Sequence, residues 1–513
     1  MDMVIFLLAL APILWLMIAL SLLKLPAFKA CPIALVIAAV LSVIIFKLPA
    51  TECLTGGLEG VALALWPICL VIVAAIFTYN LCTETGSMDC IKEMLSGVSK
   101  DKRILVLIIG WCFGGFMEGM AGFGTAIAIP ASMLCGMGFS PIAVTVACLV
   151  ANSSPTAFGS VGIPTVTLAK VAGLSSGNVA FATVLQLLPF IILTPFLMVC
   201  IIGGSVKALK GVWPVALVAG LSFAIPELLA AWFLGAELPV IIGSICSMAV
   251  TIGMVKKFYK DLDPEYAIEE RKPAGENKIT GKKAVKAWMP FLLIFVFLLL
   301  TSNMVPPVNK MLSAVKTSVL IYTGEGASPY TFTWLATPGV LILIAAIIGG
   351  RIQGAGFKQM AKVFLGTVKQ MWKTIVTIVT ILAMSKIMGY SGMIAAIAGT
   401  MLALTGSFYP LVAPLVGALG AFVTGSGTSS SVLFGSLQAQ TAASIGVSPV
   451  WLASASTVGA TIGKIISPQS IAIGAGAAGL LGFESKVLNH AVKYSGAFIL
   501  IAGCMAYFGS LIY

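Results

Sequence analysis

An acidic residue inside an apolar stretch is the first candidate for chemistry in this sequence. Glu118 lies within residues 114–164, where Gly, Pro, Ser and Asn interrupt a run that is otherwise apolar enough for a membrane. Inside lipid, interrupted backbone is tolerated only within protein or beside a water-filled cavity. We expect Glu118 to be the proton-coupling group of a transport site, since apolar surroundings disfavour its charged form. The alternative is a structural carboxylate bonded by backbone N–H groups of the Gly-rich turn.

Lys464, in the run GATIGKIISP, is the second candidate and has the opposite charge. Its long stem allows the ammonium group to reach a membrane interface. It also allows the group to face a cavity and attract a carboxylate, and the sequence leaves both interpretations open. Lys386, inside another apolar run, is interpreted as an interfacial or structural cation.

Short hydroxyl and amide side chains near these two charges form a third group of candidates. Such residues cap broken helices, and they also supply the donors and acceptors that a 2-hydroxy acid requires. Both roles are compatible. The predicted substrate-binding residues are Asn152, Ser153, Ser154, Thr428, Ser429, Ser430, Lys464, Ser467 and Gln469.

The composition places these residues in an all-α polytopic membrane protein. Of 513 residues, 59% are hydrophobic and 9% are charged, which excludes a soluble globule. The first apolar run lacks a basic leader and is predicted to be a retained span. The eleven cysteines are scattered without a CxxC pair, and the single histidine, His490, is predicted to lie in a loop. We therefore expect no metal site, disulfide or cofactor.

The net charge of +12 comes from short loops between spans, which indicates a positive-inside bias rather than nucleic-acid binding. Five basic loops, which contain Lys24 and Lys29, 92–103, Lys207 and Lys210, 256–286, and 351–373, are predicted to be cytoplasmic. The loops 48–60 and 305–334 are then outside, as is the N-terminus. Lys358, Lys362, Lys369 and Lys373 recur at spacings of four and seven, which predicts one face of a helix at the inner surface.

The hydropathy pattern predicts about 12–14 transmembrane segments, some of them broken. Continuous spans are expected near 3–23, 31–47, 61–80, 104–117, 179–202, 212–232, 237–255, 287–304, 335–350, 374–390 and 495–512. Two irregular regions interrupt these spans. The first runs from residue 114 to about residue 176, and the second runs from about 392 to 482. Whether residues 392–405 cross the membrane fully is left open by the sequence.

The second irregular region repeats features of the first. Gly138-Phe-Ser-Pro141 matches Gly446-Val-Ser-Pro449, Gly124-Thr125 matches Gly427-Thr428, and Ser154-Pro155 matches Ser467-Pro468. Ser followed by Pro favours a helix start. Two sets of broken helices whose N-termini face an anion are typical of secondary transporters.

Several long motifs resemble the lactate permease family of bacterial transporters. They include FMEGMAGFGT, ANSSPTAFGSVGIP, FVTGSGTSSSVLFGSLQAQTA and IGKIISPQSIAI. The resemblance implies import of L-lactate, or of glycolate or a related short 2-hydroxy monocarboxylate, by proton symport. It also implies an ion-transporter-type fold of two pseudo-symmetric halves with re-entrant helices. We assign residues 1–255 to the N-terminal half with the first motif at 114–176, 256–286 to a cytoplasmic linker, and 287–513 to the C-terminal half with the second motif at 417–482.

This chain departs from the family pattern in the second motif. Members usually read G-S-D-T-S-S-N where this chain has Gly425-Ser426-Gly427-Thr428-Ser429-Ser430-Ser431, and an Asn typical of the following segment is Ser456. Because this acidic position is lost, the sequence leaves open a different small organic anion as the substrate and sodium as the coupling ion. It also increases the importance of Glu118.

Two other function classes fit less well. A channel usually assembles a repeated filter from several short subunits, unlike this long duplicated chain. A membrane enzyme would need a catalytic constellation, and the sequence has no HExxH motif and no GxSxG motif with a plausible triad. We expect a bacterial plasma-membrane carrier whose partners are a small organic anion, a proton and lipid.

Overall fold

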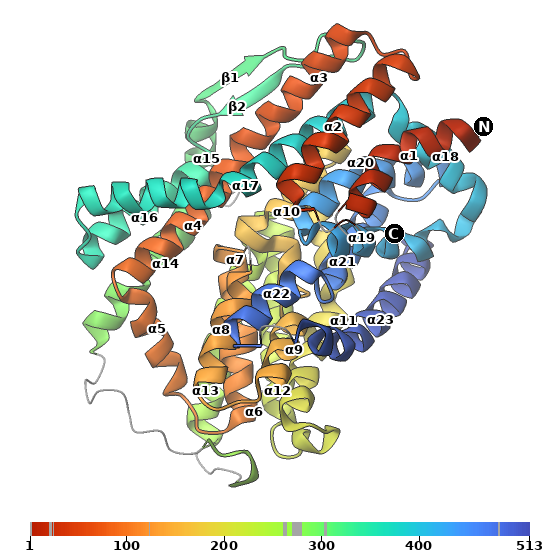
Figure 1. Cartoon of the computed structure of the whole chain (residues 1–513). Coiled ribbons are helices and arrows are strands. Elements are labelled where there is room, and N and C mark those ends of the chain that lie inside the picture. The colour runs from red at the N-terminus through yellow and green to blue at the C-terminus, as the bar shows by residue number, and fades with distance from the viewer. Residues whose placement is uncertain are drawn as a thin grey trace.

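The computed structural model describes residues 3–19, 23, 25–122, 124–259, 264–268, 280–301, 305–480 and 483–513. Several sequence predictions lie partly outside these residues: the loop position Lys24, parts of the linker 256–286, the last residues of the span 3–23 and residues 481–482 of the second motif. The described chain is almost entirely helical (Figure 1). The predicted all-α, multi-pass architecture is therefore confirmed.

The elements of the N-terminal half are α1 (Met3–Met17), α2 (Ala27–Ile44), α3 (Ala50–Leu63), α4 (Leu70–Glu84), α5 (Ser87–Ser96), α6 (Lys102–Leu105), α7 (Gly114–Met120), α8 (Thr125–Gly136), α9 (Pro141–Ala151), α10 (Gly159–Ala172), α11 (Ser176–Gly203), α12 (Trp213–Leu234) and α13 (Pro239–Phe258). Wider helical turns over Ala64–Cys69 and Val106–Phe113 join α3 to α4 and α6 to α7.

The elements of the C-terminal half are α14 (Gly281–Leu300), α15 (Pro306–Ser313), β1 (Lys316–Val319), β2 (Tyr330–Thr333), α16 (Pro338–Gln353), α17 (Phe357–Tyr390), α18 (Met393–Thr405), α19 (Tyr409–Thr424), α20 (Gly427–Ile445), α21 (Pro449–Lys464), α22 (Pro468–Ala477) and α23 (Glu484–Gly509).

Within the described residues, ten helical segments are long and apolar enough to cross a membrane, and the number rises to twelve if each of two bent helix pairs is one span. Shorter apolar helices, among them α8 and α16, add to these. The 13 residues of α18 measure about 20 Å along the helix axis, less than the roughly 30 Å of a hydrocarbon core. Alone, α18 is shorter than a membrane span, and Met393–Phe422 is among the ten segments because α18 and α19 are taken together there.

Several predicted boundaries are wrong, and the largest errors shorten a helix. The last span was expected near 495–512, but α23 begins at Glu484, so His490, predicted to lie in a loop, is in this helix. Residues 48–60 were expected to form a loop, but α3 begins at Ala50 and continues into a 35-residue helical segment ending at Glu84. Glycine in α3 permits close packing, since a Cβ atom at Gly60 would lie 2.5 Å from Cα of Ala383 in α17. Helix α17 itself begins at Phe357 and not near residue 374.

Arg103, at the start of α6, joins several segments at one end of the molecule. Its guanidinium donates to Asp101 Oδ2 at 2.7 Å and to the carbonyl oxygens of Ala208 and Lys210 at 3.2 and 3.1 Å. It also stacks 4.0 Å above the ring of Tyr266. Segments from three loops that were all predicted to be cytoplasmic therefore meet at one end of the molecule.

Replacing Arg103 by Ala is expected to lower stability by about 3 kcal/mol, because it leaves the Asp101 carboxylate buried without its partner. Thermal unfolding of the purified protein in detergent measures this. The matched control is Lys92→Ala, which removes the more exposed ion pair with Asp89 and is expected to cost at most about 1 kcal/mol. Equal melting temperatures for the two variants would contradict the role of Arg103 in joining these segments.

The other end carries the two-stranded antiparallel hairpin β1–β2, in which Lys316 pairs with Thr333 (Figure 1). Tyr322, between the strands, donates to Glu52 of α3 at 3.1 Å and stacks on Tyr390 of α17 at 3.6 Å between ring centroids. The loop 305–334, which was predicted to be outside, thus meets α3 and α17 at this end.

Lys386 of α17 lies near this end and forms an ion pair with Glu59 of α3, at 2.7 Å. Tyr390 donates to the second oxygen of that carboxylate at 2.9 Å. Lys386 is thus part of the packing between two long helices, in agreement with a structural cation.

Helices α19 and α21 pack with no side chain between them at three glycines. A Cβ atom at Gly459 would overlap the carbonyl oxygen of Pro414, one at Gly417 would overlap that of Ser456, and one at Gly463 would overlap that of Ala418. Small residues permit this close backbone approach. The pair forms one wall of the second motif region.

The two motif regions share one order of elements, a helical hairpin followed by a broken helix. The first contains the α7–α8 hairpin, then α9 and α10, which are bent by 54° at their break; the second contains the α19–α20 hairpin, then α21 and α22, bent by 42°. All four predicted Ser-Pro starts are confirmed, since helical segments begin at Pro141, Pro155, Pro449 and Pro468. The predicted repeat is therefore present as repeated structure.

Candidate functional site

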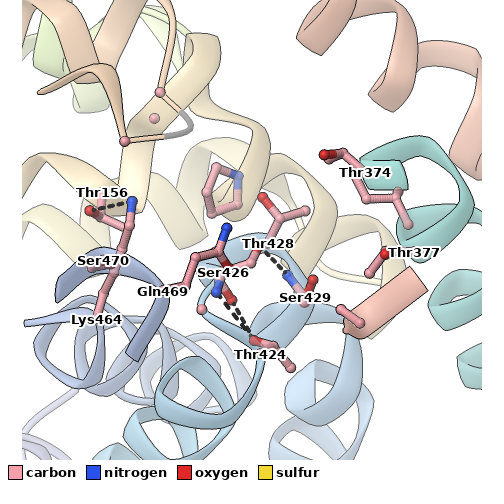
Figure 2. A pocket seen from close by; sticks show the side chains of 18 of the residues that line it. Thr156, Thr374, Thr377, Thr424, Ser426, Thr428, Ser429, Lys464, Gln469 and Ser470 are labelled. Carbon is pink, nitrogen blue, oxygen red and sulfur yellow. Dashed lines mark hydrogen bonds between the residues drawn. The ribbon is translucent and has the colours of Figure 1, made fainter. Parts of the chain in front are cut away.

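The hairpin tips and the helix breaks of both motif regions meet at one cavity of about 370 Å³. The first hairpin contributes Gly122 and Gly124, and the second contributes the tip from Thr424 to Ser429. Residues at the two helix breaks, α9–α10 and α21–α22, complete this wall of the cavity. Helix α17 forms the opposite wall (Figure 2). Segments more than 300 residues apart in sequence thus form a single site.

A buried ion pair lies in this cavity. Lys464 Nζ, at the C-terminal end of α21, is 3.0 Å from Glu118 Oε1 of α7. The exposed fraction is 2% for Glu118 and 8% for Lys464, so water screens the pair little. The position of Lys464 resolves the two alternatives left by the sequence in favour of the cavity. Its ammonium also benefits from the negative end of the helix dipole of α21.

Both charged groups retain unused hydrogen-bonding capacity. The second oxygen of Glu118, Oε2, has no hydrogen-bond partner among the described residues. Lys464 donates to Glu118 and, at 3.3 Å, to Thr156 Oγ1, whereas an ammonium group has three donors. The pair can therefore bind a further polar group without first losing either contact.

Hydroxyl and amide groups surround the pair. Thr428, Ser429 and Gln469 were predicted to bind substrate, and all three line the cavity (Figure 2). The side chain of Ser426 accepts from the N–H of Ser429 at 3.2 Å and caps α20. Donors, acceptors and the Lys464 cation within a small volume suit a short anion that carries a hydroxyl group.

Unusual backbone shapes the break between α9 and α10. Ser160 and Val161 adopt φ values of +46° and +59°, a conformation that is strained for residues other than Gly, above all for a β-branched one. The Ser160 hydroxyl donates to the carbonyl oxygen of Ala121 at 2.7 Å, which joins the break to the first hairpin tip. Gly159 leaves room for the carboxylate, since a Cβ atom there would lie 2.7 Å from Glu118 Oε1.

The other predicted substrate-binding residues lie behind the cavity lining. Ser153 and Ser430 donate to backbone carbonyl oxygens at 2.7 and 2.8 Å, and Ser467 caps α22 by accepting from the N–H of Ser470 at 3.2 Å. Asn152 donates to Thr156 at 3.2 Å, and Ser154 is buried. None of these five is among the described residues that line the cavity. The bonds of Ser153, Ser430 and Ser467 to backbone favour support of the broken helices, whereas Ser154 Oγ and Asn152 Oδ1 have no hydrogen-bond partner among the described residues.

Several cavity-lining residues were missed by the sequence reasoning. They are Thr156, Ser160, Thr424, Ser426 and Ser470 in the motif regions, and Phe28, Lys373, Thr374 and Thr377 outside them. The first group lies within or beside the quoted motifs and follows the same pattern of hydroxyls near breaks. The second group has no local signal, because its role depends on where α2 and α17 pack.

Glu227 of α12 was also missed, although it is an acid within a predicted span. It is completely buried, and neither carboxylate oxygen has a hydrogen-bond partner among the described residues. It does not line the cavity. An unpaired ionised carboxylate is costly in such surroundings, so Glu227 is a second intramembrane acid to be considered for proton transfer.

Gly427, where the family pattern has an acid, is the first residue of α20 and lines the cavity. A Cβ atom there would lie 3.2 Å from Cγ2 of Thr156, in close contact. The position thus faces the break between α9 and α10. Within the described lining residues, Glu118 is the acid of the cavity.

Comparison with known proteins gives the family. The family model of L-lactate permease matches residues 5–513. The chain belongs to the L-lactate permease family. The L-lactate permease of Streptococcus iniae is 44% identical over 87% of this chain and 92% of its own length. The glycolate permease GlcA of Escherichia coli is 35% identical over 97% of this chain and 94% of its own length. Members of this family are permeases, so this multi-pass protein is a membrane transporter.

The fold is similar to that of a solved transporter. MtrF of Neisseria gonorrhoeae, described as one of a class of antimetabolite efflux pumps, has a TM-score of 0.50 at 13% sequence identity, with 94% of each chain covered. At 13% identity the similarity concerns the fold alone. It agrees with the multi-pass helical architecture described above.

Proposed function

We propose that this protein imports L-lactate, or a closely related short 2-hydroxy monocarboxylate, by proton symport. Relatives named for lactate and for glycolate match nearly the whole chain, and both compounds are small carboxylates with a hydroxyl group on the adjacent carbon. The observation that carries the proposal is the buried Glu118–Lys464 pair inside a cavity lined by hydroxyl groups.

Lys464 is the proposed partner of the substrate carboxylate. It is a buried cation with an unused donor at the cavity, and a hydrogen bond to a charged group contributes about 1.5–3 kcal/mol. Thr428, Ser429 and Gln469 would supply bonds to the substrate hydroxyl. A neutral substrate would gain less from Lys464 than an anion does, and a cationic substrate would be repelled by it.

The ion pair suggests how a proton and an anion are coupled. A substrate carboxylate that accepts from the unused donor of Lys464 comes close to the negative charge of Glu118 and is repelled by it. Protonation of Glu118 removes that repulsion. Proton and substrate then strengthen each other's binding, and this coupling is necessarily reciprocal. The loaded site carries the same net charge as the empty one, which favours movement of both together.

The proposed orientation follows the distribution of basic residues. The segments around Arg103, Lys210 and Tyr266 meet at one end of the molecule, and the hairpin β1–β2 lies at the other. The positive-inside tendency assigns the first end to the cytoplasm of a bacterial cell. The N-terminus is then outside the plasma membrane.

Purified protein in proteoliposomes preloaded with L-lactate is expected to accumulate labelled lactate by counterflow. Glycolate outside should compete, because it keeps both the carboxylate and the 2-hydroxyl group, whereas propionate, which lacks the hydroxyl, should compete weakly. Exchange of a dicarboxylate without exchange of lactate would refute the proposal. If lactate accumulation depends on an imposed sodium gradient and not on a pH gradient, the substrate assignment stands, and sodium is the coupling ion in place of the proton.

A further inference from the structure

The cavity wall opposite the broken helices carries a cation, Lys373 of α17. Lys373 is exposed, whereas Glu118 and Lys464 are buried in the same cavity. The cavity therefore extends from an accessible cation on one side to a buried ion pair on the other. Thr374 and Thr377, from the same helix, line the wall beside Lys373 (Figure 2).

The surroundings of Lys373 leave its charge available. Its ammonium lies 5.2 Å from the ring centroid of Phe28 and 5.8 Å from that of Trp372, and the two rings are in edge contact at 5.2 Å. No salt bridge of Lys373 is present within the described part of the chain. The aromatic faces hold the ammonium near the cavity without neutralising it.

Lys373 also differs from the other lysines of its helical face. Lys358, Lys362, Lys369 and Lys373 are all exposed on α17, as the spacing predicted. Of these four, Lys373 is the one that lines the cavity. Attachment to the membrane surface accounts for a row of exposed lysines, but it does not account for a cation at the entrance of a site.

We propose that Lys373 binds the carboxylate of the substrate at the mouth of the cavity, between Lys464 and the solution on the side onto which the cavity opens. This inference rests on the proposed function, since it requires an anionic substrate. An exposed ammonium attracts an anion over roughly 8 Å at physiological salt and binds it weakly. Weak binding at the mouth allows the anion to move on to the buried pair, where water competes less.

The test compares Lys373→Gln with the matched control Lys369→Gln, which removes a charge one helical turn away from the same exposed face. Uptake of labelled substrate is measured in right-side-out and in inverted membrane vesicles. Lys373→Gln is expected to raise KM about tenfold with little change in maximal rate, and only in the vesicles whose outer face is the one onto which the cavity opens. The positive-inside tendency predicts that these are the inverted vesicles. Lys369→Gln is expected to leave KM unchanged.

Ionic strength gives a second measurement. Rising salt should increase KM of the unmodified protein and of Lys373→Arg, and it should affect Lys373→Gln much less, because the charge that salt screens is absent. Equal effects of Lys373→Gln on both faces, or a lower maximal rate at unchanged KM, would overturn the proposal and indicate that Lys373 only packs α2 against α17. If the unmodified protein transports another small carboxylate instead of lactate, the same comparison is made with that anion, so failure of the substrate assignment is distinguished from failure of the role of Lys373.

Discussion

Glu118→Gln is expected to abolish the accumulation of lactate against its gradient while leaving lactate exchange in place. The Gln side chain resembles the protonated carboxyl group in size and lacks its charge. Its amide oxygen can still accept from Lys464, which lies 3.0 Å from Glu118 Oε1, so the site remains assembled. Without a titratable group, an imposed pH gradient has no means of driving the substrate. The measurement is uptake into proteoliposomes under a pH gradient, with counterflow at equal pH as the internal reference.

The matched control is Glu227→Gln, which changes the other fully buried acid identified in the membrane-spanning helices. Glu227 lies outside the cavity lining, so its variant is expected to retain both accumulation and exchange. If Glu118→Gln still concentrates lactate at acid external pH and Glu227→Gln does not, Glu118 is structural and the coupling group is in α12. Loss of exchange together with accumulation in Glu118→Gln would instead show that the carboxylate is needed to assemble the site.

Lys464→Gln is expected to weaken substrate affinity by about 1.5–3 kcal/mol, the contribution of a hydrogen bond to a charged group. The variant also leaves the Glu118 carboxylate buried without a partner, which costs about 3–5 kcal/mol of stability. Arg at this position should restore little affinity, because its planar fork differs in size and geometry from an ammonium group. Titration of substrate protection against thermal unfolding measures affinity, and the melting temperature without substrate measures stability.

The double variant Glu118→Gln/Lys464→Gln separates these two effects. Removing both charges should recover most of the lost stability, since no unpaired charge remains, and should leave affinity low. Recovery of affinity along with stability would mean that Lys464 acts only on the fold. Unchanged affinity in Lys464→Gln alone would exclude Lys464 from substrate binding.

Features that depend on local chemistry were predictable from the sequence. Each Ser-Pro pair of the two motif regions began a helical segment, because Pro at the first turn loses no hydrogen bond and fixes a helical φ. Glu118 and Lys464 were both identified, since a charge inside an apolar run is expensive and therefore informative. Thr428, Ser429 and Gln469 lie close to the second hairpin tip or the second break, where a hydroxyl or amide group has unpaired backbone and cavity nearby.

Features that depend on tertiary packing were not predictable. Glu118 and Lys464 are 346 residues apart, and nothing local indicates that their side chains meet. Lys373 has the same spacing as the surface lysines before it, and only the position of α2 and the hairpin tips makes it part of the cavity. Residues 48–60 were assigned to a loop, although Gly60 lies in α3 and lets that helix approach α17 closely. Ser153 and Ser430 have the composition of a binding site, but they bond to backbone because a carbonyl group lies closer than the cavity does.

The absence of side chains between α19 and α21 has a consequence for how the site changes its access from one side of the membrane to the other. Backbones in direct contact at Gly417, Gly459 and Gly463 leave no adaptable layer in which one helix can slide past its neighbour. Lys464, at the end of α21, and the second hairpin tip, at the end of α19, would therefore travel as one rigid body. Alternating access then depends on the boundary with α17, where ordinary side chains such as Thr374 and Thr377 can exchange partners. Spin labels on α19 and α21 would keep a constant separation through the transport cycle, whereas labels on α19 and α17 would not.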